Sequence, residues 1–289
     1  MAKKDRLILV TGATGKQGGA AVRHLRERGF PVRAMTRDPE QPQARAMENQ
    51  GVEVVKGDLD DVASIARALD GVYGVYSVQD WSGGAEAEIR QGINLVEAAE
   101  REVVDHFVYG SVASAERNTG IPHFDSKFQI EERIRATGVP YTILRPVFFM
   151  ENWLGMRESI EQGTIALPLK PETRLQMIAV DDIGAFAATA FEHSGKWRGR
   201  ALDIAGDEHS MEETARVLSG VAGREVTYRQ IPWEDFERNA GHEMAVMFRW
   251  FETTGYDLDL SALREERPNL LTLEMWAQTH WERAARAAK

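Results

Sequence analysis

The sequence predicts an α/β protein with a doubly wound parallel sheet and a smaller, mostly helical C-terminal region. Three observations lead to this fold class. An apolar strand, Leu7 to Val10, runs directly into three glycines spaced three apart and then into a helix. Strand and helix patterns alternate with short turns through the first half of the chain. From Pro146 the alternation becomes irregular, which indicates a second region.

The first half of the chain contains the regular part of this pattern. A helix is expected over 17–28, because Ala21, Val22 and Leu25 lie on one helical face and Gly29 follows as a C-terminal cap. Further strands are expected at 32–35, 52–56, 72–78, 106–110 and 141–144, and further helices at 43–50, 62–69, 85–102 and 124–137. Each of these helices ends near a glycine or at the next strand.

The second region has weaker signals. Helices are expected at 152–162, 183–191, 211–222, 233–254 and 273–286, and extended segments at 174–180, 200–205 and 225–230. Asp181 and Asp182 precede the helix 183–191 and are expected to cap it. The last sixty residues hold four tryptophans, which we interpret as core side chains between helices.

Composition excludes several functional classes. The chain has 289 residues, 43% of them hydrophobic, and a formal net charge of −10, which argues against direct nucleic-acid binding. It has no cysteine, so disulfides and thiolate sites are excluded, and its histidines show no metal-site spacing. No apolar run is long enough to span a bilayer, and the N-terminus leads into a strand instead of a signal peptide. We therefore expect a cytoplasmic protein without a metal or a membrane partner.

The glycine loop has the spacing of a dinucleotide cradle. Gly12 allows the tight turn, Gly15 lets the backbone approach a pyrophosphate, and Gly18 lets the helix pack against the strand. The pyrophosphate would then lie at the helix N-terminus, where free N–H groups favour negative charge. A glycine turn with a purely structural role is the alternative.

The end of the second strand predicts which dinucleotide binds. NAD-binding proteins usually place an acidic residue there, whereas this chain has Thr36 and Arg37. A guanidinium binds a 2′-phosphate that a carboxylate would repel, and Lys16 adds a second positive charge nearby. NADP(H) is therefore favoured over NAD(H). In the alternative interpretation Arg37 pairs with Asp38 and Lys16 is simply solvated.

Several motifs together resemble the NmrA-like family, atypical members of the short-chain dehydrogenase/reductase superfamily with a Rossmann fold. The resemblance covers nearly the whole chain and rests on four motifs in addition to the glycine loop: Thr36-Arg37-Asp38-Pro39, Gly57-Asp58-Leu59, Pro122-His123-Phe124-Asp125-Ser126-Lys127 and Arg145-Pro146-Val147-Phe148-Phe149-Met150-Glu151-Asn152. It implies NADP(H) binding, either for hydride transfer in an oxidoreductase or for sensing the redox state of the cofactor.

The resemblance also assigns cofactor contacts by position. It places these residues around the pyrophosphate: Gly12, Thr14, Gly15, Lys16, Gln17 and Gly18. It places Arg37 on the 2′-phosphate and Asp58 and Leu59 beside the adenine. Along the ribose and nicotinamide it places Ser77, Val78, Gln79, Lys127, Phe148 and Phe149. The structural alternatives are a turn at Asp58, a solvated lysine and two core phenylalanines.

The chain departs from the superfamily at the catalytic pair. Active short-chain dehydrogenases commonly have Tyr-x-x-x-Lys, which places both side chains on one helical face. Here His123 stands four residues before Lys127. His123 is either a non-catalytic replacement or an acid or base, since a free imidazole, with a pKa of about 6.5, exchanges protons near neutral pH. Ser111 follows the expected fifth strand and is a second candidate for polarising a substrate.

These observations leave two functions open. The first is an NADPH-dependent reductase of a small aromatic or quinone-like compound, with Trp81, Phe148 and Phe149 against the substrate. The second is a non-catalytic NADP(H) redox sensor that acts through a regulatory protein partner. In both cases we expect residues 1–150 to form the cofactor domain and 151–289 the substrate or partner region, with about 174–206 returning to the first domain.

Overall fold

The structure, a computed structural model, describes the backbone of residues 2–287 and the side-chain environments of residues 2–281. The chain divides into two compact units. Unit 1 comprises Met1–Asn118, Pro122–Arg145 and Ile183–Asp203, and unit 2 comprises Thr119–Ile121, Pro146–Asp182 and Ile204–Lys289.

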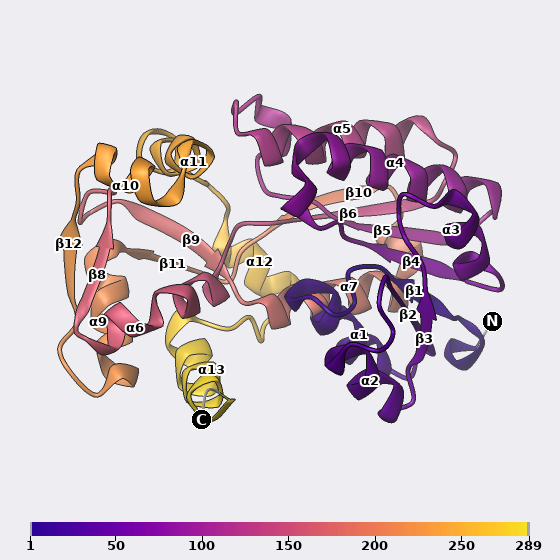
Figure 1. The fold of residues 1–289 in the computed structure, drawn as a ribbon, viewed down its shortest axis with the longest axis horizontal. Coiled ribbons are helices and arrows are strands. Elements are labelled where there is room, and N and C mark those ends of the chain that lie inside the picture. Colours follow the sequence, from indigo (N-terminus) through magenta and orange to yellow (C-terminus); the bar gives the residue numbers. More distant parts are fainter. Residues whose placement is uncertain (1, 288–289) are drawn as a thin grey trace. The chain divides into compact units, whose positions relative to one another are not determined.

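Unit 1 contains a seven-stranded sheet with the order β10-β6-β5-β4-β1-β2-β3 (Figure 1). Its strands are β1 (Ile8–Val10), β2 (Val32–Thr36), β3 (Glu53–Lys56), β4 (Gly74–Ser77), β5 (His106–Gly110), β6 (Tyr141–Pro146) and β10 (Arg200–Ile204). The six neighbouring strands β6, β5, β4, β1, β2 and β3 all pair in parallel. The chain builds β2 and β3 on one side of β1 and then β4, β5 and β6 on the other, which confirms the predicted doubly wound fold.

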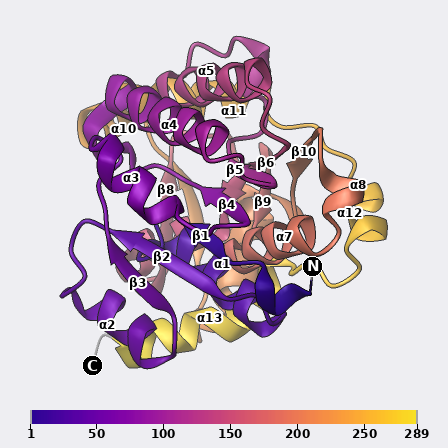
Figure 2. The same ribbon diagram turned by 90° about the vertical axis from the view of Figure 1, so that its right-hand side faces the viewer.

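Helices cover both faces of this sheet. Figures 1 and 2 show α3 (Val62–Leu69), α4 (Gly84–Arg101) and α5 (Pro122–Ala136) on one face. They also show α1 (Lys16–Glu27), α2 (Pro42–Asn49) and α7 (Val180–Glu192) on the opposite face. An apolar cluster lies beneath α3, α4 and α5, where Leu9, Val75, Phe107, Ile130 and Ile143 are all inaccessible to solvent.

A late segment of the chain completes unit 1. A Cβ at Gly184 would lie 2.5 Å from the carbonyl carbon of Ala20, so only glycine lets α7 approach α1 this closely. The short helix α8 (Ser194–Trp197) then leads to β10 at the edge of the sheet. There the Thr142 hydroxyl donates a hydrogen bond to the carbonyl of Trp197 at 2.7 Å.

Unit 2 contains two small sheets and most of the remaining helices. The three-stranded sheet has the order β11-β9-β7 (Asp207–Ser210, Arg174–Ile178 and Phe148–Phe149), and the two-stranded sheet pairs β12 (Thr227–Gln230) with β8 (Thr164–Leu167). The helical elements are the 3-10 helix η4 (Met150–Met156), α6 (Arg157–Glu161), α9 (Met211–Ala222), α10 (Trp233–Ala240), α11 (His242–Thr253), α12 (Leu260–Glu266) and α13 (Leu273–Ala287). Of the four tryptophans expected in the core, Trp276 and Trp281 on α13 are buried, whereas Trp233 and Trp250 are half-buried.

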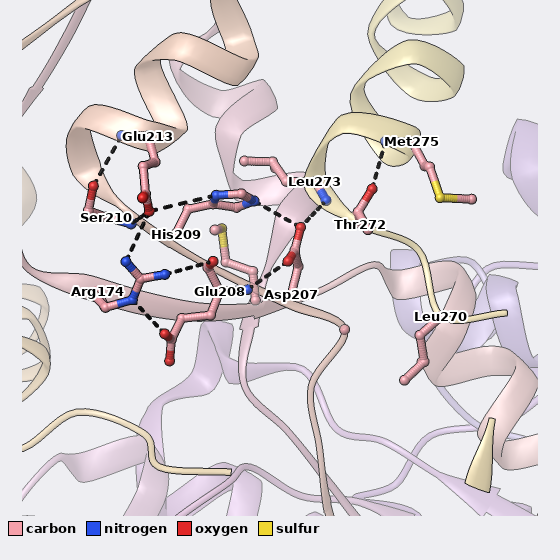
Figure 3. A network of polar contacts seen from close by, with 12 residues as sticks. Arg174, Asp207, Glu208, His209, Ser210, Glu213, Leu270, Thr272, Leu273 and Met275 are labelled. Atoms are coloured by element: carbon pink, nitrogen blue, oxygen red, sulfur yellow. Dashed lines mark hydrogen bonds and ion pairs between the residues drawn. The ribbon is translucent and has the colours of Figure 1, made fainter. Parts of the chain in front are cut away.

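A polar network joins β11 to the starts of two helices in unit 2 (Figure 3). Asp207 accepts a hydrogen bond from the backbone N–H of Leu273 at 2.7 Å, at the start of α13. The same Asp207 oxygen lies 2.9 Å from Nε2 of His209. Ser210 and Glu213 form a capping box, in which each side chain accepts a hydrogen bond from the backbone N–H of the other residue. These contacts fix where α9 and α13 begin.

Two expectations for unit 2 were wrong and one was borne out. Asp182 does not precede and cap the helix, because α7 already begins at Val180 and the buried Asp182 carboxylate accepts hydrogen bonds from the backbone N–H of Leu271 and from Arg267. The segment 152–162 is helical, as expected, with a 3-10 helix up to Met156 and an α-helix from Arg157 to Glu161. The expected helix 233–254 is two helices that meet at Gly241, where φ is +89°. The strands β7, β8 and β11 and the helix α12 had not been predicted.

Candidate functional site

The glycine loop of unit 1 has a geometry that only glycines permit. Gly12 follows β1 with a φ of +59°, a conformation that L-residues rarely adopt. A Cβ at Gly18 would lie 2.2 Å from the carbonyl oxygen of Gly12, so the first turn of α1 packs against the loop backbone. Gly15 is the N-cap of α1 and donates its N–H to the carbonyl of Gly12 at 2.9 Å. The loop therefore presents the helix N-terminus at the edge where the sheet order reverses, which is the expected place for a ligand.

Strand β4 supports this loop from the side. The Thr11 hydroxyl donates to the Val78 carbonyl and accepts from the Val78 N–H, both at 3.0 Å. The Gln17 amide donates to the hydroxyl of buried Tyr76 at 2.9 Å, so the Gln17 side chain is directed at the sheet. Val78 and Gln17 thus hold the cradle in shape, and their predicted contact with a cofactor stays a prediction.

The end of β2 places Arg37 on the surface, with 70% of its side chain exposed. Its Nη2 lies 3.6 Å from Oδ2 of Asp80, so its ion pair joins it to Asp80 and not to Asp38, the partner in the alternative interpretation. Gln41 donates to the Thr36 hydroxyl at 2.8 Å and lies 3.5 Å from the Thr14 hydroxyl. Gln41 thus connects the glycine loop to the end of β2, and no motif along the chain had indicated this role.

Asp58 and Leu59 follow β3 in a tight turn. The Asp58 carboxylate accepts the N–H of Asp60 at 2.9 Å, and its carbonyl accepts the Ser64 hydroxyl at 3.0 Å. The Leu59 carbonyl accepts the amide of Asn94 at 2.9 Å. The structural alternative for Asp58, a turn residue, is therefore present, and both residues lie half-buried at the same edge of the sheet as the glycine loop.

An unsatisfied acceptor lies at the end of β4. The Gln79 amide nitrogen donates to the Ser77 hydroxyl at 2.9 Å, and both side chains are buried. The Gln79 amide oxygen Oε1 is buried and has no hydrogen-bond partner. Because buried polar atoms are nearly always paired, this acceptor is suited to a donor on a bound ligand. The glycine cradle and this oxygen therefore fit a dinucleotide.

His123 and Lys127 lie one turn apart on α5. The Lys127 Nζ donates to Oε1 of Glu88 at 2.5 Å, and Glu88, on α4, is completely buried. The His123 ring meets the Trp81 ring edge-on, with 5.5 Å between centroids. The structure thus brings Trp81 and His123 together, as two of the predicted site residues, and reveals Glu88 as a partner of Lys127 that the sequence had not indicated.

Ser111 belongs to a buried charge network. Its hydroxyl donates to Oε1 of Glu131 at 2.6 Å, and Glu131 also accepts two hydrogen bonds from Arg145 at 2.8 and 2.6 Å. Arg145 further pairs with Glu116 at 2.6 Å and Asp203 at 3.5 Å. Burial raises the pKa of Asp203 to about 6, with Arg145 opposing the shift and Glu116 adding to it. Ser111 is thus committed to Glu131, and its proposed contact with a substrate stays a prediction.

Phe148 and Phe149 form β7 in unit 2. Phe148 contacts the rings of Trp153 and Phe251, with centroid distances of 5.7 and 6.2 Å. Both phenylalanines remain half-buried, whereas Trp153 and Phe251 are buried. Phe148 therefore lies at the margin of an aromatic cluster, and Phe149 is its neighbour in the strand.

The described part of the chain lacks two other kinds of feature. No helix within residues 2–287 combines the length and the apolar character needed to cross a membrane. No group of His, Asp and Glu side chains among the described residues is arranged to hold a metal ion.

Comparison with known proteins identifies the family. The sequence profile of the NmrA-like family matches residues 4–277. The chain belongs to the NmrA-like family. It is 31% identical to the NAD(P)H azoreductase of Xenophilus azovorans over 230 residues, which cover 79% of this chain and 78% of the relative. It is 26% identical to quinone oxidoreductase 2 of Escherichia coli over 233 residues, covering 80% and 79% of the two chains.

A solved structure confirms the likeness of this NmrA-like protein in three dimensions. The triphenylmethane reductase of Citrobacter sp., crystallised with NADP(H), superposes with a TM-score of 0.81 at 26% identity. The match covers 95% of this chain and 99% of the reductase.

Proposed function

We propose that this NmrA-like protein is an NADPH-dependent reductase of a small aromatic, quinone-like or azo compound. The observation that carries the proposal is the glycine cradle at the reversal point of the sheet, with Arg37 and the unsatisfied Gln79 oxygen beside it. The azoreductase, quinone oxidoreductase and triphenylmethane reductase relatives support a reductase over a redox sensor.

Each part of unit 1 has a separate task in holding the cofactor. The N–H groups at the start of α1 bind the pyrophosphate, and Arg37 with Lys16 binds the 2′-phosphate. The Gln79 oxygen accepts a hydrogen bond from the ribose or nicotinamide part of the cofactor. The bound cofactor supplies hydride to the substrate. Binding and orientation are therefore the main contribution of these residues.

Lys127 and His123 act at the reactive end of the site. An ammonium has three donors, of which the contact with Glu88 occupies one, so Lys127 retains donors for the hydroxyls of the nicotinamide ribose. Glu88 fixes the position of Lys127 and balances its charge. His123 supplies the proton that a reduced carbonyl or quinone oxygen requires, because imidazole exchanges protons near neutral pH.

The cofactor assignment is tested by calorimetry with NADPH and NADH. We expect NADPH to bind more tightly, because a hydrogen bond to a charged group contributes about 1.5 to 3 kcal/mol, or roughly tenfold to a hundredfold in affinity. Arg37→Ala should remove this difference and leave NADH binding nearly unchanged. The matched control is Arg67→Ala, because Arg67 is an exposed arginine on α3 that pairs with Asp61. Equal affinities for the two cofactors in the unmodified protein would contradict the assignment.

The reductase activity is tested by NADPH oxidation with a panel of quinones, azo dyes and triphenylmethane dyes. We expect turnover with at least one of these classes, and a loss of about 10² to 10⁴ in the chemical rate for His123→Ala with cofactor affinity retained. His242→Ala is the control, since His242 is 81% exposed and pairs with Glu237 in unit 2. A preparation that binds NADPH but reduces none of these acceptors would overturn the proposal and favour the redox sensor.

A further inference from the structure

Arg37 is paired with a carboxylate that belongs to another strand end. Asp80 lies three residues beyond β4, and Arg37 directly follows β2. Strand β1 lies between β4 and β2 in the sheet, and the glycine loop begins at its end. The ion pair between Arg37 and Asp80 therefore joins the two strands that flank the cradle.

The same carboxylate organises the turn that carries Trp81. Asp80 is the N-cap of the 3-10 helix η2 (Trp81–Gly83), where its Oδ1 accepts the Ser82 N–H at 3.1 Å. Its Oδ2 accepts the Ser82 hydroxyl at 2.6 Å and faces Arg37. The hydroxyl and N–H of Ser82, and more weakly the charge of Arg37, lower the pKa of Asp80, so it is ionised near neutral pH.

Arg37 also faces a second carboxylate at longer range. Asp60 interacts with Arg37 through space, but its own hydrogen bonds go to Arg90 at 2.7 Å and Gln91 at 2.8 Å. Asp38 uses its carboxylate to accept the N–H of Glu40 at 3.0 Å. Of these three acidic residues, Asp80 is the one within ion-pair distance of Arg37.

We infer that Asp80 is a specificity residue that competes with the 2′-phosphate of NADPH for Arg37. The inference rests on the proposed position of Arg37 at the 2′-phosphate. A phosphate carries a charge of about −1.5 to −2 against −1 for the carboxylate, so it displaces Asp80 when it binds. Asp80 thereby reduces the preference for NADPH over NADH. Its hydrogen bonds to Ser82 persist through the exchange, because they involve a different donor.

The variant Asp80→Asn separates the charge from the cap. Asparagine is as good an N-cap as aspartate, so the turn at Trp81 is retained while the ion pair is lost. We expect NADPH to bind about two- to fivefold more tightly, the range that corresponds to one exposed ion pair, and NADH to be nearly unaffected. The gain should shrink in high salt, where exposed charges are screened. Asp60→Asn, with the same change in charge, is the matched control and should have a smaller effect.

A double-mutant cycle with Arg37→Ala decides whether the effect passes through Arg37. If Asp80 competes for Arg37, Asp80→Asn tightens NADPH binding in the native background and has little effect in the Arg37→Ala background. Equal tightening in both backgrounds would show general repulsion of the phosphate, and no tightening would show no competition; either result overturns the inference. Arg37→Ala alone tests the position of Arg37 at the 2′-phosphate: if it leaves the NADPH preference intact, the inference fails. The reductase activity is tested separately by NADPH oxidation, so a failure confined to Asp80→Asn leaves the proposed function standing.

Discussion

Asp203 at the end of β10 should make unit 1 less stable as the pH rises. Its carboxyl group shares Arg145 with Glu116 and Glu131, and its pKa is raised to about 6 mainly by burial. An aspartate in the unfolded chain has a pKa of about 3.9. The folded protein therefore holds this proton more tightly than the unfolded chain does.

The size of the effect follows from the difference of about two pKa units, which corresponds to about 3 kcal/mol. This stabilisation is complete below the unfolded pKa and is lost as the pH rises through about 6. About half of it should disappear between pH 5 and pH 8. Asp203→Asn removes the titration and leaves Arg145 with Glu131 and Glu116 as partners.

Urea unfolding of both proteins at several pH values measures this difference. We expect the stability of Asp203→Asn relative to the unmodified protein to increase by about 1 to 1.5 kcal/mol from pH 5 to pH 8. Asp105→Asn, which alters an aspartate whose side chain is 59% exposed, should show no such trend. A difference that is constant over this pH range, or that decreases, would refute the reasoning.

Two further substitutions test the backbone of unit 1. Val103 lies just after the end of α4, at a position where glycine is favoured, and it has a φ of +52° and an exposed fraction of 81%. Val103→Gly should therefore raise the free energy of unfolding by about 1 kcal/mol. A lower midpoint of urea unfolding would contradict this. Gly18→Ala should lower it by about 1 to 3 kcal/mol and weaken dinucleotide binding, because the new Cβ would overlap the Gly12 carbonyl. Gly138→Ala, where nothing lies within 4 Å, is its control in thermal unfolding and should be nearly neutral.

The regular part of unit 1 was predictable because local signals and tertiary structure agree there. The expected strand 106–110 and helix 62–69 match β5 and α3 residue for residue. Apolar periodicity and glycine caps specify such elements without reference to distant residues. The glycine loop was predictable for the same reason, since its backbone geometry depends on three nearby glycines.

The missed elements depend on distant partners. The strand β11 (Asp207–Ser210) contains no apolar residue and exists because it pairs with β9 and because Asp207 meets the start of α13. Asp182 resembles a helix cap in sequence, but Leu271 and Arg267, nearly ninety residues later, provide its donors. Propensity alone does not report such contacts.

The candidate site divides in the same way. The residue types of the cradle, Arg37, His123 and Lys127 follow from motifs along the chain. Their partners do not, because Glu88 and Asp80 lie on other elements and reach the site through the pairing of β4 with β1 and the packing of α4 on α5. Charge pairing between elements is set by the fold and leaves no signature at either residue.

The late segment that completes unit 1 has a consequence for synthesis on the ribosome. Until residues 183–203 have emerged, β6 lacks its neighbour β10 and the surface of α1 at Ala20 lacks Gly184. A nascent chain that stops near residue 150 therefore carries an open strand edge, a recognised starting point for aggregation. We expect the nucleotide-binding half to depend on translation of the later segment or on chaperone protection, so that it cannot be cut out as an N-terminal fragment. Unit 1 can therefore complete its sheet only after part of unit 2 has been synthesised.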